Sequence, residues 1–173
     1  MEKITSASLA EAIQGFRFPR YGEIPTVGLY LEQTIKYING YLAPLGCMEL
    51  TSSMVSNYVK KGLVPAPVKK LYYPEQIAYL FFVALAKNLM AMEDINLLIR
   101  VQRESYTLPV AYDYLCDEID NMMGYVFGLK DSVEALGVTK SGEKDLLRNL
   151  VFSAANVIYL HLYCAQLRQQ EQK

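Results

Sequence analysis

Three prolines within residues 62–74 constrain this fold more than any other feature of the chain. Pro65 and Pro67 lack the amide hydrogen that helices and sheet interiors need, so the segment around them must follow an extended path. Pro74 has the opposite meaning, because its fixed φ suits the first turn of a helix. The sequence therefore predicts a short non-helical loop with a helix on each side.

The helix before this loop has recognisable ends. Thr51 is placed as its N-cap, where the side-chain oxygen can accept from free amides of the first turn, and Gly62 closes the helix about three turns later. The apolar side of this helix carries Val55, Tyr58 and Val59. The polar side carries Ser53, Ser56, Asn57 and Lys60.

Further helices are predicted before and after this pair. Apolar residues recur at helical spacing from Leu31 to Leu42, and Pro44 with Gly46 ends that helix. After Pro74, the nearly all-apolar run over residues 77–86 predicts a helix that is surrounded by other elements. Another helix is predicted over about residues 93–103.

The last third of the chain predicts a helical hairpin. Apolar residues recur in steps of three and four from Tyr112 to Leu136, and a second series runs from Leu147 to Cys164. These helices can pair within one chain or with a second chain. We expect a mainly α protein in three parts: an N-terminal arm over 1–28 that can hold a short helix, a helix-turn-helix unit over 29–104, and a helical hairpin over 105–173 suited to dimerisation or effector binding.

Charge is unevenly distributed along a chain whose formal net charge is −1. Residues 51–73 contain four lysines and no Asp or Glu, a local charge of +4, whereas residues 111–136 hold six carboxylates and one lysine, a local charge of −5. A basic patch on a near-neutral protein fits a modest nucleic-acid footprint, and it fits an ordinary solvated surface about equally well.

Catalytic and metal-binding chemistry has little support in the sequence. The three cysteines show no metal-ligand spacing, and His161, the single histidine, lies on an apolar helical face. The sequence contains no glycine-rich phosphate loop and none of the common hydrolase or zinc-protease motifs. We therefore expect no enzymatic activity, no metal and no cofactor.

The sequence also favours a cytoplasmic location. No signal-peptide pattern is found, and the longest apolar run, over residues 77–86, has roughly half of the ~20 residues that cross a bilayer. An odd number of cysteines without a disulfide pattern fits a reducing compartment. We expect no association with membranes.

The stretch LTSSMVSNYVKKGLVPAPVKKLYYPEQIAYLFFVALAKNLMAMEDINLLI resembles the regulators of the MerR family. It shares their recognition helix ending in a tyrosine and GL-P-P, the restart at Y-P-E, and a later helix with an acidic residue before I-LL. The matching residues are Tyr58, Gly62, Leu63, Pro65, Pro67, Tyr73, Glu75, Asp94, Ile95, Leu97 and Leu98. The longer stretch from FPRYGEIP, near Phe18, to Ile99 resembles a bacterial family catalogued as domain of unknown function 1836, which is expected to contain a MerR-like winged helix.

This resemblance implies a winged helix-turn-helix that binds double-stranded DNA as a homodimer. Ser53 and Ser56 stand where MerR recognition helices usually present arginines, and the wing would be only a few residues long. We predict a DNA-binding transcriptional regulator, with an unidentified small-molecule effector also allowed. The predicted DNA contacts are Ser53, Ser56, Asn57, Tyr58, Lys60, Lys61, Lys69 and Lys70. The alternative is a winged-helix scaffold without DNA binding that serves protein–protein interaction or small-molecule sensing.

Overall fold

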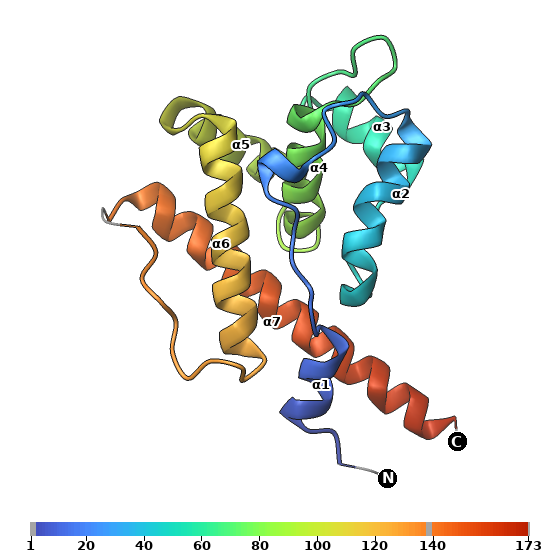
Figure 1. Cartoon of the computed structure of the whole chain (residues 1–173), viewed down its shortest axis with the longest axis vertical. Helices are drawn as coiled ribbons and strands as arrows, with labels where there is room; N and C mark the ends of the chain where they lie inside the picture. The colour runs from blue at the N-terminus through green and yellow to red at the C-terminus, as the bar shows by residue number, and fades with distance from the viewer. Residues whose placement is uncertain (1–2, 138–139, 173) are drawn as a thin grey trace.

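The computed structural model describes residues 3–137 and 140–172, which form seven α-helices and two short 3-10 helices (Figure 1). The fold is therefore mainly α, as the sequence predicts. The α-helices are α1 (Ser6–Ala12), α2 (Leu31–Leu42), α3 (Ser52–Lys60), α4 (Pro74–Ala86), α5 (Met92–Ser105), α6 (Leu108–Val126) and α7 (Gly142–Glu171). The 3-10 helices are η1 (Tyr21–Glu23) and η2 (Ala43–Leu45).

The predicted wing does not form as a sheet. The described part of the chain contains no β-strand, and the loop 61–73 has one isolated bridge between Val68 and Leu71, while a second bridge joins Leu29 to Tyr72. The two prolines of this loop cannot donate to a strand ladder, so pairing is confined to the tip and the base of the loop. The sequence predicts a winged helix-turn-helix, and this prediction is wrong about the wing. The structure has a helical unit whose loop closes in one short turn at Val68 and Leu71.

Helix α4 lies at the centre of the core. Side chains 76–86 are buried apart from Phe82, which is half-buried. The Phe81 ring contacts aromatic rings from three other segments, with centroids 4.9 Å from Phe18, 5.8 Å from Tyr41 and 6.2 Å from Tyr112. This enclosure explains the nearly all-apolar sequence of α4, because a helix with neighbours on several sides has no polar face to keep.

Helices α6 and α7 form the most extensive helix pair, and α7 crosses α6 diagonally in Figure 1. The two helices of the predicted hairpin therefore pack together within one chain. The buried face of α7 consists of Leu150, Val151, Ala154, Ala155 and Ile158. By length and composition alone α7 could cross a membrane, a test that core helices of soluble proteins also pass.

The first helix of this hairpin is shorter than its sequence pattern predicts. The apolar series reaches Leu136, but α6 ends well before it, because Gly128 adopts a left-handed φ of +72° and the next two amides donate to the carbonyl of Gly124. The Asn121 amide then binds both the N–H (3.0 Å) and the C=O (2.8 Å) of Glu134. A glycine cap and a side-chain clamp thus turn the chain back, and the prediction of a helix through Leu136 is wrong.

A short N-terminal helix forms where one was expected, and it is tied to α7. Thr5 and Ser8 cap the start of α1, and Leu9 is fully buried. The Ser8 hydroxyl donates to Gln166 Oε1 (3.1 Å), while Gln166 Nε2 donates to the Ser8 carbonyl (3.1 Å). As a result α1 lies beside the C-terminal half of α7 (Figure 1).

Candidate nucleic-acid interface

The start of α3 is fixed by hydrogen bonds from two neighbouring helices. Asn39 of α2 binds both backbone groups of Leu50, donating to its carbonyl and accepting from its N–H, each at 2.8 Å. Lys87, at the end of α4, donates through Nζ to the carbonyl of Glu49 (2.6 Å). Thr51 caps α3 as predicted, since its hydroxyl oxygen accepts from an amide of the first turn at 3.3 Å. The helix is therefore held by its connection to α2 and α4.

The two sides of α3 differ as the sequence predicts. Val55 is fully buried, and Leu63, just after the helix, is buried as the anchor of the closing turn at Gly62, whose φ is +77°. On the opposite side Ser53, Ser56 and Lys60 are exposed. We call these three residues the outer face of α3.

Two of the predicted DNA contacts do not belong to the outer face. Tyr58 is only 5% exposed, and its burial raises the pKa of its hydroxyl. Asn57 is half-buried, and its amide donates to Sδ of Met92 in α5 at 3.7 Å. These two side chains hold α3 against its neighbours, so neither is available on the surface in the way that Ser53 and Lys60 are.

Lys69 and Lys70 occupy an unusual turn between α3 and α4. Their φ values are +50° and +67°, so both residues are left-handed, and Val68 and Leu71 exchange two backbone hydrogen bonds of 2.9 Å across them. Such two-residue turns normally contain Asn-Gly or Asp-Gly, because a side chain is unfavourable in this conformation by about 1–2 kcal/mol. We call residues 68–71 the lysine turn. It lies in the loop that projects beyond α3 and α4 in Figure 1.

The base of this loop is firmly attached to the core. Tyr72 and Leu29 exchange backbone hydrogen bonds of 2.8 and 2.9 Å. The buried side chain of Gln76 accepts from the N–H of Tyr73 (2.9 Å) and donates to the carbonyl of Ala66 (3.3 Å), so it binds the chain on both sides of the lysine turn. Gly28 permits the close approach, because a Cβ there would lie 2.8 Å from a side-chain atom of the lysine turn.

Sequence reasoning did not identify these anchors. Gln76 stands three residues after the N-cap Tyr73, the position where Glu or Gln completes a helix cap, so the signal was present but did not reveal the contact with the loop. Gly28 carried no such signal, because its φ is not left-handed and its need for a small side chain arises only from packing against the loop.

The basic residues of this region are free to meet a ligand. Lys60, Lys61, Lys69 and Lys70 are all exposed, and within the described residues none of them forms an ion pair with a carboxylate. One acidic group lies nearby, since Glu32 accepts a 2.6 Å hydrogen bond from the Ser52 hydroxyl at the start of α3. We call the outer face of α3 together with Lys61 and the lysine turn the basic edge.

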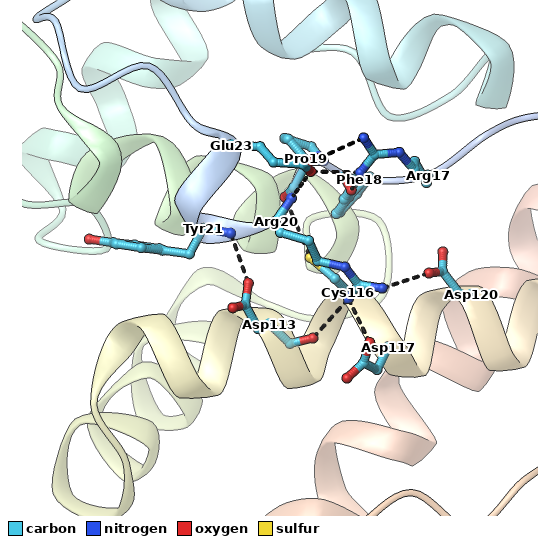
Figure 2. Close-up of polar contacts among 10 residues, drawn as sticks. All are labelled: Arg17, Phe18, Pro19, Arg20, Tyr21, Glu23, Asp113, Cys116, Asp117 and Asp120. Atoms are coloured by element: carbon cyan, nitrogen blue, oxygen red, sulfur yellow. Dashed lines mark hydrogen bonds and ion pairs between the residues drawn. The ribbon is translucent and has the colours of Figure 1, made fainter.

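A second polar cluster, drawn in Figure 2, joins the N-terminal segment to α6. The Arg20 guanidinium binds Asp117 (2.7 Å) and Asp120 (2.9 Å) and donates to the backbone carbonyl of Asp113 (3.1 Å). The Asp113 carboxylate accepts from the N–H of Tyr21 (2.8 Å). The acidic stretch of α6 therefore holds the FPRYGEIP segment.

The groups in this cluster are neutralised rather than poised for reaction. Arg17 forms a double ion pair with Glu23 (2.6 and 2.9 Å), whose carboxylate also accepts from the N–H of Arg20, and these bonds lower the pKa of Glu23 to about 2. Burial raises the pKa of the Cys116 thiol to about 12, so the reactive thiolate is disfavoured. In residues 3–137 and 140–172 no three His, Cys, Asp or Glu side chains are grouped to hold a metal ion.

Comparison with known proteins supplies a family for this chain. The family model described as Domain of unknown function (DUF1836) matches residues 19–115, which is more than half of the 173-residue chain. The match covers α2 to α5 and the first part of α6, and it includes the whole basic edge, whereas α1 and α7 lie outside it. No curated protein and no solved structure matches the chain.

Proposed function

This chain belongs to the DUF1836 family, and from its geometry we propose that it is a cytoplasmic, DNA-binding transcriptional regulator with a MerR-like helix-turn-helix. The observation that carries the proposal is the basic edge. Exposed hydroxyls and a lysine on α3 stand in one short segment with two lysines that an unfavourable left-handed turn keeps at the tip of a loop. Strained backbone of this kind concentrates at functional sites.

The basic edge has the parts that double-stranded DNA requires. A helix of this kind fits the major groove, where the short side chains of Ser53 and Ser56 can reach base edges. Lys60 and Lys61 at the end of α3, with the lysine turn, would contact phosphates along the groove. Phosphate contacts set affinity and position, whereas base contacts set sequence preference. Because only four lysines are involved, we expect a modest and salt-dependent affinity.

The salt dependence gives a direct test. The affinity for a fluorescent random duplex is measured by anisotropy at several salt concentrations, and four phosphate contacts give a log–log slope of about −3.6. The double variant Lys69→Gln/Lys70→Gln should make this slope less negative by about 1.8, since each lost phosphate contact contributes about 0.9. Lys3→Gln/Lys140→Gln is the matched control, because it removes the same charge from exposed lysines elsewhere. Equal slopes in the two variants would refute the assignment.

Two further variants separate base contacts from phosphate contacts. Ser53→Ala/Ser56→Ala should leave the salt slope unchanged and alter the sequences that are enriched from a random duplex pool. Glu32→Gln should tighten binding to any duplex, because it removes the carboxylate beside the start of α3. Weaker binding by Glu32→Gln would show that α3 does not face the phosphates.

We also propose that the protein forms a homodimer through α7. Phe152, Leu160 and Tyr163 are exposed on that helix at spacings of eight and three residues, which place them on one face. Two copies would double the number of basic edges and strengthen a weak contact. Light scattering should show a dimer that Leu160→Glu dissociates. A dimer that binds no duplex would favour the alternative function, a scaffold for protein–protein interaction.

A further inference from the structure

An apolar cavity of about 240 Å³ lies between α4, α5, α6 and the first turns of α7. Each of these helices contributes apolar side chains to its wall, among them Phe82 of α4, Leu98 of α5, Ala111 of α6 and Leu147 of α7. The cavity is separate from the basic edge, and no residue of α3 or of the lysine turn lines it. Its wall thus combines helices inside and outside the family match.

Glu143 and Lys144 at the start of α7 bring charged side chains to this lining, whereas most of its uncharged polar groups already have hydrogen-bond partners. The Tyr79 hydroxyl donates to Gln102 Oε1 (3.1 Å) and accepts from Arg103 Nε (3.1 Å), and Gln102 Nε2 donates to the carbonyl of Tyr106 (2.9 Å). Tyr112 is the exception, because its buried hydroxyl has no hydrogen-bond partner in the described residues.

The size of the cavity defines the size of a suitable ligand. An apolar cavity of about 150 Å³ holds benzene, so by proportion about 240 Å³ holds roughly ten non-hydrogen atoms. The exposed part of its lining is mainly apolar, with Val101, Tyr106, Val110 and Leu146, and Glu143 at the start of α7 is its exposed charged residue. An entering molecule therefore meets a mainly apolar surface.

We propose that this cavity is a binding site for a small, uncharged, mainly hydrocarbon molecule of the size of a two-ring aromatic. An apolar ligand would displace water from this mainly apolar surface and gain dispersion contacts with the wall. An uncharged ligand is favoured, because most of this wall is apolar and burying a charge against it is strongly unfavourable.

The test uses naphthalene and indole as probes. The chain contains no tryptophan, so indole fluorescence can be excited without a tryptophan background from the protein. We expect saturable one-to-one binding in a solution that contains no DNA, so the result is independent of the proposed DNA binding. Ala111→Phe fills the cavity and should weaken binding at least about tenfold. Ala12→Phe, an equal change at an exposed position of α1, should leave it unchanged.

A second variant keeps the test decisive if the filled cavity prevents folding. Leu98→Ala enlarges the cavity, so the preference should shift from naphthalene toward anthracene, which has one more ring. Absence of saturable binding, equal binding by Ala111→Phe and the parent chain, or an unchanged size preference in Leu98→Ala would overturn the proposal. It would also be overturned if probe binding fell as protein concentration rose, since the mouth would then be covered by a second copy.

Discussion

Replacing both lysines of the lysine turn with residues that favour a left-handed backbone should stabilise the fold and weaken DNA binding. Lys69 and Lys70 both have left-handed φ values, each unfavourable by about 1–2 kcal/mol for a residue with a side chain. The double variant Lys69→Asn/Lys70→Gly introduces the pair that such turns prefer. Asparagine relieves part of the strain at position 69. Glycine at position 70 loses more conformational entropy on folding, which reduces the gain in unfolding free energy by about 0.5–1 kcal/mol. The expected net gain in the free energy of unfolding is about 1–2 kcal/mol.

Urea denaturation followed by circular dichroism measures this gain, and the melting temperature should rise by about 2–8 °C. Lys69→Gln/Lys70→Gln is the matched control, because it removes the same two charges and keeps the left-handed side chains. Both variants should lose DNA affinity to the same extent, but only the Asn-Gly variant should be stabilised. Equal stabilities of the two variants would refute the idea that the backbone of this turn is strained.

Three further predictions concern contacts that hold the fold. Arg148→Met should cost about 3–5 kcal/mol of unfolding free energy, because it leaves the fully buried Glu118 carboxylate without its ion-pair partner, and Glu118→Met in the same chain should recover most of that loss in a denaturation cycle. Gly28→Ala should weaken duplex binding in an anisotropy titration, because the added Cβ pushes the lysine turn away. The pKa of Glu23 is lowered from 4.5 to about 2 by its bond to Arg17, so its stabilisation is complete above pH 4.5 and lost as pH falls toward 2; acid unfolding of Glu23→Gln should therefore be less steep in that window.

Local signals in the sequence were enough to predict most helices. Thr51 caps α3 and Pro74 opens α4 as expected. The first amides of a helix have no backbone partner, so a threonine side chain can accept from one of them, and a proline there loses no hydrogen bond. The buried run in α4 was also foreseeable, because an all-apolar helix has to be enclosed. The exposed hydroxyls and Lys60 on α3 followed from the same periodicity.

Contacts between distant segments could not be predicted in this way. The sequence gives no partner for the carboxylates of α6, but Arg20, about one hundred residues earlier, neutralises Asp117 and Asp120. The early end of α6 depends on Asn121 binding the backbone of Glu134, which no periodicity reveals. The left-handed lysines were equally hidden, because lysine has no preference for that conformation and the surrounding bridges impose it.

One helix connects the two proposed sites. Gln76, in the first turn of α4, binds the chain on both sides of the lysine turn, and two residues later Ala78 lines the apolar cavity. A ligand that displaces α4 must therefore displace the anchor of the lysine turn as well. Such coupling is reciprocal, so the factor by which saturating naphthalene changes the affinity for a duplex must equal the factor by which a saturating duplex changes the affinity for naphthalene. Two titrations measure these factors independently, and if both factors equal one, α4 does not transmit any displacement between the sites.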